Sequence, residues 1–134
     1  MATLLDISQY LKTLKNYLVD TWELDPDFAE KAAQLVYYCL AYRLRPEITS
    51  GYRSPERQAE LVAAWNSGNP NVHTPLPPGK SLHNNTTWYG KPAALALDMV
   101  TSSPSLAGRI AAALGLVWGG ENDYVHFALR RGTL

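Results

Sequence analysis

The spacing of apolar side chains divides the chain into a helical first part and a mixed second part. Apolar residues recur at helical spacing over residues 4–18 and again over residues 28–40. Asp25 and Pro26 stand where an N-cap and a first-turn proline would begin the second of these helices, which ends before Pro46. We therefore predict two amphipathic helices in the first part of the chain.

Short β-prone segments follow and are interrupted by two more helices. One predicted helix is capped by Ser54 and stops near Gly68, and the other runs from Pro104 to residue 114 and is closed by Gly115. The β-prone segments lie at 47–53, 81–83, 95–100, 116–118 and 124–128. Helices come first and strands mostly later, with short connections, so we predict an α+β fold with a small antiparallel sheet.

The chain shows no internal repeat and no linker between domains. Residues 69–80 hold four of the nine prolines, and we interpret this stretch as a loop. A chain of 134 residues is long enough for one hydrophobic core and too short for two. We predict one domain over residues 1–134, made of an N-terminal helical part, 1–44, and a second part, 45–134.

The balance of charge argues against two classes of partner. Twelve Lys and Arg residues offset twelve Asp and Glu residues, so the formal net charge is zero. Electrostatic binding to nucleic acid or to an anionic membrane surface normally needs a marked excess of positive charge. We therefore expect no nucleic-acid partner and no membrane partner, and we expect a monomer.

The sequence also bears on disulfides and on secretion. The single cysteine, Cys39, excludes an internal disulfide, and its apolar neighbours predict a buried core thiol. Residues 1–10 lack the basic start and apolar run of a classical signal peptide. No stretch approaches the roughly 18 apolar residues that a membrane span requires. We expect a protein made in the cytoplasm without a classical signal peptide.

Three side chains that can bind a metal stand in β-prone segments. His83 and His126 each lie in one such segment, and Asp98 lies in another. Catalytic zinc sites typically take three ligands from His and carboxylate side chains and leave the fourth position to water. Asp123, just after Gly119-Gly120 and three residues before His126, is placed to act as a general base towards that water.

Spacing alone leaves two other interpretations open. A histidine in a strand is more often a hydrogen-bonded structural residue than a metal ligand. An aspartate at the end of a strand is more often a cap or a solvated charge. The motifs around these residues bear on the choice.

Four short motifs occur in the order in which one family of zinc peptidases has them. Residues 48–58 contain Ser-Gly-Tyr-Arg-Ser, residues 81–83 read Ser-Leu-His, residues 96–98 read Ala-Leu-Asp, and residues 114–127 contain Trp-Gly-Gly and Asp-Tyr-Val-His-Phe. They resemble motifs of the zinc D-Ala-D-Ala carboxypeptidase and L-alanyl-D-glutamate endopeptidase family, which includes VanY-like peptidases and many phage endolysins. The resemblance covers residues 45–128, and four motifs in one order are far more specific than any single one.

The resemblance implies a fold and a set of site residues. The fold would be hedgehog/DD-peptidase-like, with an antiparallel sheet that carries the zinc site and packs with the N-terminal and flanking helices. By the family's pattern His83, Asp98 and His126 match the zinc ligands, and Asp123 matches the catalytic acid and base. Arg53 matches the arginine that stabilises the developing oxyanion. Ser81 is expected to hydrogen-bond the substrate peptide.

The resemblance also implies a substrate and a place of action. The partner would be bacterial peptidoglycan peptides, hydrolysed with Zn²⁺ as cofactor by an endolysin-type endopeptidase or a D,D-carboxypeptidase. The motifs do not choose between an L-Ala-D-Glu bond, a D-Ala-D-Ala bond and a crosslink to diaminopimelate. We expect action at the cell wall or periplasm after release or delivery, as for a peptidase encoded by a phage or prophage.

The match departs from the family in two places. The family usually has six residues between its first histidine and its aspartate, whereas 14 separate His83 from Asp98. The extra residues fall within 84–93, a polar, turn-rich stretch that we expect to extend a hairpin tip, where Trp88 and Tyr89 either line the cleft or lie exposed. The segment before Asp123 is short, which leaves Glu121 as a competing acid in a less suitable position.

Two other functions remain as alternatives to an enzyme. One is a non-catalytic, zinc-containing binding module of the same fold, and the other is a structural protein without metal. Both Asp123 and Arg53 are present, which favours catalysis. His73 has no partner at metal-binding spacing, and we expect the aromatic residues of the first two helices to pack in the core or between helices.

Overall fold

The structure, a computed structural model, describes residues 4–68 and 80–130. The predicted loop at 69–80, apart from Lys80, lies outside the described residues, as does His73. Along the chain the elements are α1 (Leu4–Trp22), α2 (Pro26–Ala41), β1 (Glu47–Ser50), α3 (Pro55–Asn66), the 3-10 turn η1 (Leu82–Asn84), β2 (Ala96–Val100), α4 (Pro104–Ala113), β3 (Val117–Trp118), the 3-10 turn η2 (Glu121–Asp123) and β4 (His126–Ala128).

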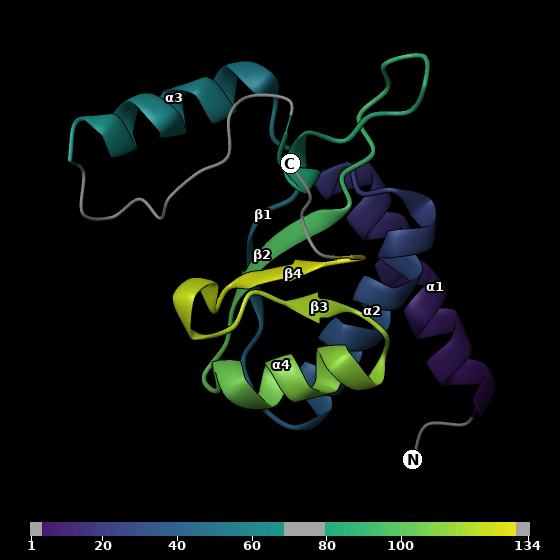
Figure 1. The fold of residues 1–134 in the computed structure, drawn as a ribbon. Coiled ribbons are helices and arrows are strands. Elements are labelled where there is room, and N and C mark those ends of the chain that lie inside the picture. The colour runs from purple at the N-terminus through teal and green to yellow at the C-terminus, as the bar shows by residue number, and fades with distance from the viewer. Residues whose placement is uncertain (1–3, 69–79, 131–134) are drawn as a thin grey trace.

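The four strands form one antiparallel sheet in the order β1-β2-β4-β3. Figure 1 shows α1 and α2 packed side by side along one side of the sheet, while α4 packs against β3 and α2. The α+β fold with a small antiparallel sheet and flanking helices is therefore confirmed. Among the described helices, none is long and apolar enough to cross a membrane.

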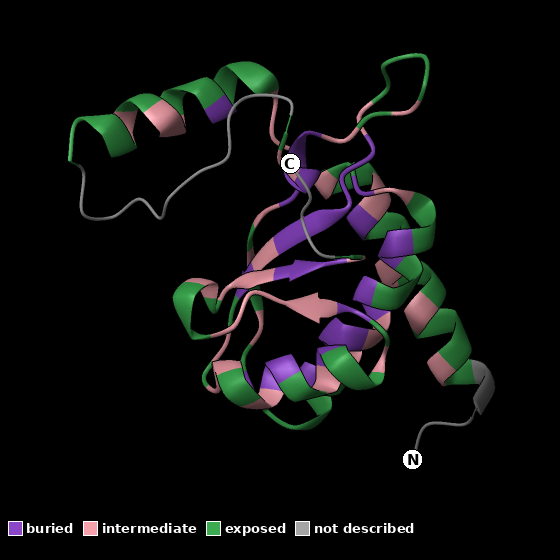
Figure 2. Ribbon diagram, in the orientation of Figure 1, coloured by how far each residue is buried: buried purple, intermediate pink, exposed green. Residues whose placement is uncertain are grey.

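The hydrophobic core fills the space between the sheet and these helices. Leu97 and Met99 of β2 and Phe127 of β4 are at most 1% exposed, and they belong to one cluster with Leu18 and Phe28 of α1 and α2. Figure 2 shows the buried positions gathered on β2, on β4 and on the helices beside them. Because side chains alternate along a strand, the residues between these core positions project from the other face of the sheet.

Local signals in the sequence set the helix ends as expected. Asp25 Oδ1 accepts hydrogen bonds from the backbone N–H groups of Asp27 and Phe28 at the start of α2. Ser54 Oγ accepts one from the N–H of Arg57 in α3. Gly115, directly after the C-cap of α4, has a φ of +81°, which glycine adopts without strain. The single thiol, Cys39, is buried, and burial raises its pKa to about 11.

One predicted strand is wrong. The residues around His83 form the 3-10 turn η1 rather than a β-strand. Ser81 Oγ accepts a hydrogen bond from the N–H of His83 at 3.1 Å, and the Ser81 carbonyl accepts one from the N–H of Asn84 at 2.9 Å. This local hydrogen bonding satisfies backbone groups that a strand would have paired with a neighbour.

The expected packing of the N-terminal aromatic residues in the core or between helices is confirmed in part. Phe28 is fully buried, and the ring of Tyr10 in α1 contacts that of Tyr37 in α2, with ring centres 6.0 Å apart. Tyr17, Tyr38 and Tyr42, however, are between 43% and 62% exposed. A tyrosine can cover apolar surface with its ring while its hydroxyl stays in water, so helical spacing alone does not place it in the core.

A glycine in α4 lets Trp118 pack against the helix. A Cβ added at Gly108 would lie 2.4 Å from two atoms of the Trp118 ring. The Trp118 indole N–H also donates to the carbonyl of Tyr124 at 2.9 Å, so this ring supports the turn between β3 and β4. That turn contains Asp123.

We expect Gly108→Ala to destabilise the protein, against the usual effect of this substitution. Alanine normally stabilises a helix interior by about 1 kcal/mol relative to glycine. Here the added methyl group would collide with Trp118, and such overpacking costs about 1–3 kcal/mol. Urea unfolding measures the difference, with the exposed Ser105→Ala on the same helix as control. A more stable Gly108→Ala variant would show that Trp118 does not lie on Gly108.

Candidate metal centre

The sheet places three polar residues in one row on its outer face. Asp98 of β2 pairs with His126 of β4 on one side and with Ser50 of β1 on the other. Residues directly opposite in neighbouring strands point to the same face. A break in register between Ile48 and Ser50 lets Ser50 face Asp98. Irregularities of this kind commonly redirect a side chain next to a functional site.

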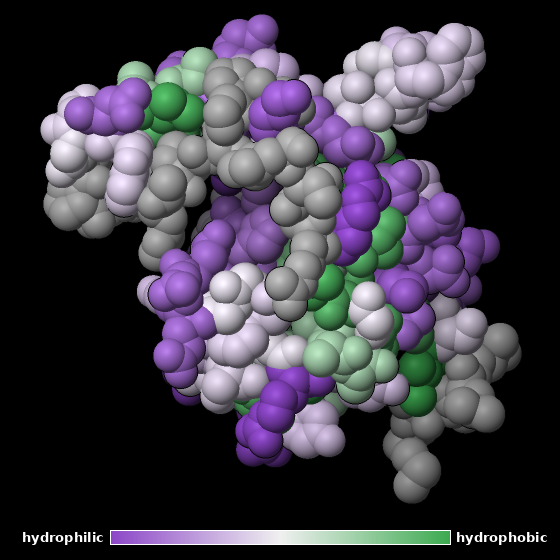
Figure 3. Space-filling view, viewed as in Figure 1, coloured by the Kyte–Doolittle hydropathy of each residue, from purple (hydrophilic) through white to green (hydrophobic). Residues whose placement is uncertain are grey.

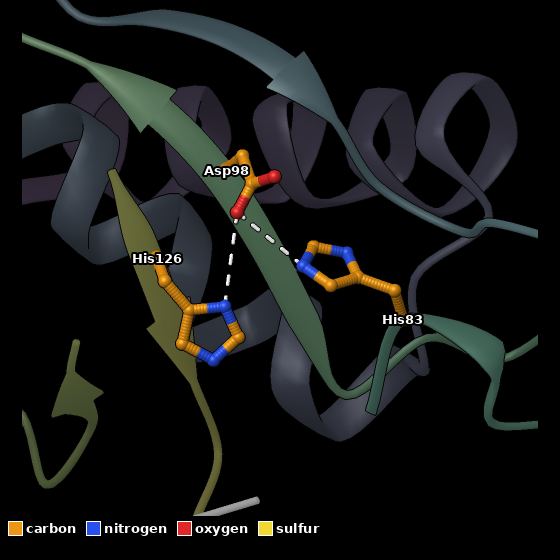
Figure 4. Close-up of side chains that lie close together, drawn as sticks. All are labelled: His83, Asp98 and His126. Atoms are coloured by element: carbon orange, nitrogen blue, oxygen red, sulfur yellow. Dashed lines mark ion pairs between the residues drawn. The ribbon is translucent and has the colours of Figure 1, made fainter. Parts of the chain in front are cut away.

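The turn η1 brings His83 to this row. Figure 4 shows the side chains of His83, Asp98 and His126 pointing towards one another from η1, β2 and β4. His83 Nε2 lies 3.3 Å from Asp98 Oδ1, and His126 Nδ1 lies 3.7 Å from the same oxygen. One ligand atom from each residue can be chosen so that all lie within 4.8 Å of one another. The three predicted ligands therefore form one cluster.

The spacing of these atoms suits a tetrahedral metal ion. Zinc binds His nitrogen and carboxylate oxygen at about 2.0–2.2 Å, which puts two tetrahedral ligands about 3.3 Å apart. The separation between His83 Nε2 and Asp98 Oδ1, 3.3 Å, matches that value, and the separation between His126 Nδ1 and Asp98 Oδ1 is longer, 3.7 Å. His83 is buried and Asp98 is 19% exposed by its side chain, so the cluster is shielded and still reachable from solvent.

The hydrogen bonding of His83 leaves the correct nitrogen free for a metal. His83 Nδ1 lies 2.8 Å from the carbonyl oxygen of Gly51, and since a carbonyl only accepts, Nδ1 carries the hydrogen. In a neutral imidazole Nε2 then has a lone pair, and it faces the carboxylate of Asp98. Two acceptors this close need a cation or a proton between them. Metal-bound histidines commonly donate their second N–H to a backbone carbonyl in this way.

Gly51 can fill this role because its backbone lies against the end of α1. A Cβ added at Gly51 would lie 2.3 Å from the carbonyl oxygen of Trp22 and 2.7 Å from its Cβ. The N–H of Tyr52 donates to the same carbonyl at 2.8 Å. The loop that orients His83 is thereby fixed to the first helix, and any larger residue at Gly51 would displace it.

Arg53 holds the second oxygen of the Asp98 carboxylate. Its Nη2 lies 3.3 Å from Asp98 Oδ2 and 3.2 Å from Ser50 Oγ, and its Nη1 donates to Gln58 Oε1 at 3.0 Å. Asp98 therefore points Oδ1 at the two histidines and Oδ2 at Arg53. The predicted arginine lies beside the cluster, with its fork already oriented by three side chains.

The charge on Asp98 is stabilised by this environment. Burial alone would raise the pKa of Asp98, but hydrogen bonds and charge from His126 and His83 outweigh it, and the net result is a pKa below the ordinary value. The carboxylate thus stays ionised at neutral pH, which is the form that binds a metal ion.

Asp123 lies next to His126, whereas Glu121 points to solvent. A Cβ added at Gly119 would lie 3.0 Å from Cβ of Asp123 and 3.1 Å from Cβ of His126, so these two side chains leave the backbone close together. Asp123 is half-buried. Burial lowers the pKa of Arg53 below its ordinary value, and the charge of Asp98 opposes this more than the charge of Asp123 does. Glu121 is exposed at the other end of η2. The role of Asp123 as the acid and base stays a prediction.

Two buried polar residues that support the site received no role from the sequence. Gln58 is 1% exposed and accepts from the Arg53 guanidinium, and Asn84 is 6% exposed and donates from Nδ2 to the Arg53 carbonyl at 2.6 Å. The Arg53 N–H in turn donates to the His83 carbonyl at 2.8 Å. In the sequence Asn84 was counted among the turn residues of the insertion. The only sequence feature that pointed to Gln58 was its place within the first motif, residues 48–58.

The remaining candidates are Ser81 and the two aromatic residues of the insertion, and they lie in different surroundings. Ser81 caps η1 and so positions His83, while its contact with substrate stays a prediction. The insertion after His83 forms a hairpin tip, joined by a bridge between Thr86 and Pro92. Its Trp88 is 95% exposed and contacts the Tyr89 ring, with ring centres 5.5 Å apart. These aromatics lie exposed at the tip.

Comparisons with known proteins find a similarity among solved structures. Neither the protein-family models nor the curated proteins contain a match to this chain. Among solved structures the chain is similar to the L-Ala D-Glu endopeptidase ChiX of Serratia marcescens, with 20% sequence identity, coverage of 96% of each chain and a TM-score of 0.48. At this level of likeness the residues of the site carry the functional conclusion.

We expect zinc to stabilise the wild-type protein through this cluster. A ligand that binds only the folded state at about 100 times its Kd adds about 2.7 kcal/mol to the free energy of unfolding. Chemical unfolding of metal-free protein, with and without added ZnCl₂, measures this gain, and elemental analysis gives the metal content. His83→Ala should lose both the gain and the bound metal.

The matched control is Glu121→Gln, which removes a nearby carboxylate from outside the cluster. It should retain the metal and the gain in stability. Equal stabilisation of the wild type and of His83→Ala by zinc would place the metal elsewhere.

Proposed function

We propose that this protein is a zinc-dependent peptidase that hydrolyses the peptide stems or crosslinks of bacterial peptidoglycan. The observation that carries the proposal is the cluster of His83, Asp98 and His126, three residues from distant parts of the sequence. Two histidines and one carboxylate are a ligand set of catalytic zinc sites, which keep an open position for water. The four motifs that resemble the zinc peptidase family contain these three residues and Asp123.

The residues around the cluster fit the two tasks of peptide hydrolysis. A zinc ion held by these ligands would supply Lewis acidity and lower the pKa of a water molecule to near neutrality. Asp123, beside His126, would take the proton of the attacking water and later pass it to the leaving amine. Arg53, which remains charged at any working pH, would stabilise the negative charge that develops on the scissile carbonyl oxygen.

The arrangement of Arg53 suits this role because it requires little reorganisation. Three side chains already hold its guanidinium group, namely Ser50, Gln58 and Asp98. Donors fixed before the reaction stabilise developing charge better than donors that must first be ordered. The same contacts keep Asp98 in position to bind the metal.

The proposed biological setting is that of an endolysin-type enzyme, encoded by a phage or prophage. Such an enzyme would reach the cell wall or periplasm after release or delivery. The cleaved bond would be an L-Ala-D-Glu bond, a D-Ala-D-Ala bond or a crosslink to diaminopimelate, so the protein would act as an endolysin-type endopeptidase or as a D,D-carboxypeptidase. The substrate contact proposed for Ser81 belongs to the same site.

We expect Asp123→Asn to keep the metal and to lose most of the activity. Removing a general acid and base typically lowers the rate by about 10²–10⁴-fold, while the three metal ligands remain intact. The release of new amino groups from purified peptidoglycan measures hydrolysis, and elemental analysis measures zinc in the same samples.

Glu121→Gln is the matched control, because it neutralises the other acid of η2, and it should remain active. Loss of activity in Glu121→Gln with full activity in Asp123→Asn would reverse the assignment of the base. Stoichiometric zinc in the wild type without any hydrolysis would instead indicate a zinc-containing binding module.

A further inference from the structure

A recess adjoins the metal cluster between the sheet and α3. It has a volume of ≈ 500 Å³, and its walls include Asp98, Arg53, Arg57 and Leu61, with hydroxyl groups of Thr49 and Ser54. In Figure 3 the surface between α3 and the body of the protein is largely hydrophilic. Because Asp98 forms part of both, the recess begins at the metal ligands and leads away from them.

The two arginines of this recess differ in the partners that hold their guanidinium groups. Arg53 is held by Asp98, Ser50 and Gln58 and faces the metal cluster. Arg57, in the first turn of α3, pairs with Glu60 at 2.7 Å, and the two side chains are 60% and 65% exposed. An exposed pair of this kind is worth only about 0–1 kcal/mol. Arg57 can therefore exchange Glu60 for another anion at little cost.

The position of Arg57 makes an anion in the recess favourable. The charge of Arg57 acts on Arg53, and the two arginines repel each other across the recess. An anion between them would relieve this repulsion. An arginine also matches a carboxylate geometrically, because two parallel N–H groups can bind its two oxygens.

The candidate substrates share a carboxylate at one defined place. An L-Ala-D-Glu bond of the stem, a D-Ala-D-Ala bond and a crosslink to diaminopimelate each release an amine. In each case the carbon that bears this amine also bears a free carboxylate. The group lies next to the scissile bond, on its leaving side.

Arg53 connects the metal cluster to the recess, because its Nη2 lies 3.3 Å from Asp98 Oδ2 and its side chain forms part of the recess wall. In the proposed site the scissile carbonyl oxygen lies against Arg53, so the substrate next to the scissile bond lies at the entrance of the recess that Arg57 also lines. The carboxylate beside the scissile bond is the anionic group that the substrate can offer to Arg57 there.

We propose that Arg57 binds the free carboxylate on the carbon that bears the leaving amine, in the recess between β1 and α3. This inference rests on the proposed peptidase function and adds a determinant of specificity to it. The enzyme would then prefer substrates in which this carboxylate is free over those in which it is an amide, since an amide has no charge for Arg57 to bind.

The test uses two pairs of synthetic peptides with the wild-type protein and with Arg57→Gln. One pair contains an L-Ala-γ-D-Glu bond with the α-carboxyl free or amidated, and the other ends in D-Ala-D-Ala with the terminal carboxyl free or amidated. For the bond that is cleaved, the wild type should prefer the free carboxylate by about tenfold to a hundredfold in kcat/KM. Arg57→Gln should lose this preference, mainly through a higher KM, because binding rather than chemistry is affected.

Three further variants separate substrate binding from a structural role. Arg57→Lys should keep part of the preference, since it retains the charge and loses the paired N–H groups. Glu60→Gln should leave KM unchanged or lower it, because Arg57 is then released, whereas a merely structural ion pair would make it behave as Arg57→Gln does. Arg109→Gln, at an exposed arginine of α4 outside the recess, should match the wild type.

The outcomes distinguish this inference from the proposed function. Equal hydrolysis of free and amidated peptides by the wild type, or an unchanged preference in Arg57→Gln, would overturn the role of Arg57 and leave the peptidase intact. An absence of hydrolysis of all four peptides and of purified peptidoglycan by zinc-loaded wild type would overturn the proposed function, and this inference with it.

Discussion

The register of β2 between β1 and β4 is the constraint on which the candidate site depends. Asp98 stands opposite His126 and Ser50, while its neighbours Leu97 and Met99 are buried in the core. A slip by one residue would move the apolar side chains into water and Asp98 into the core, at the cost of several buried side chains. The packing of the hydrophobic face therefore fixes the geometry of the polar face.

The Asp98 carboxylate joins the parts of the site that the sheet does not supply. One oxygen faces the histidines and the other is held by Arg53, so the negative charge is shared between a metal-binding side and an arginine side. The loop of Arg53 and the turn of His83 are fastened together, because the Arg53 N–H donates to the His83 carbonyl and Asn84 donates to the Arg53 carbonyl. Loss of any of these hydrogen bonds would shift the candidate ligands, because the bonds connect the backbone at Arg53 and His83 to the side chains of the cluster.

The surroundings of the cluster divide into a buried side and an accessible side. Behind it lie the core strands and α2, while α3 extends away from the body of the protein in Figure 1 and contributes only Gln58 to the buried residues. The space between α3 and the sheet is consequently polar and open to solvent. A site of this construction holds its candidate ligands on the sheet and on η1 and is open to solvent on one side.

The sequence by itself determined the features that depend on neighbouring residues. Proline and cap residues set the starts of α2 and α3, a glycine ended α4, and apolar spacing indicated the α+β fold, because these signals act within a few residues. Motifs picked out His83, Asp98 and His126, although His83 proved to lie in a capped turn. Only the tertiary structure decided that their ligand atoms meet, that Asn84 and Gln58 support Arg53, and that Arg57 shares a recess with Asp98. Apart from Arg53 and Gln58, which are five positions apart, these contacts join residues between 15 and 45 positions apart, and no local pattern specifies contacts at such a separation along the chain.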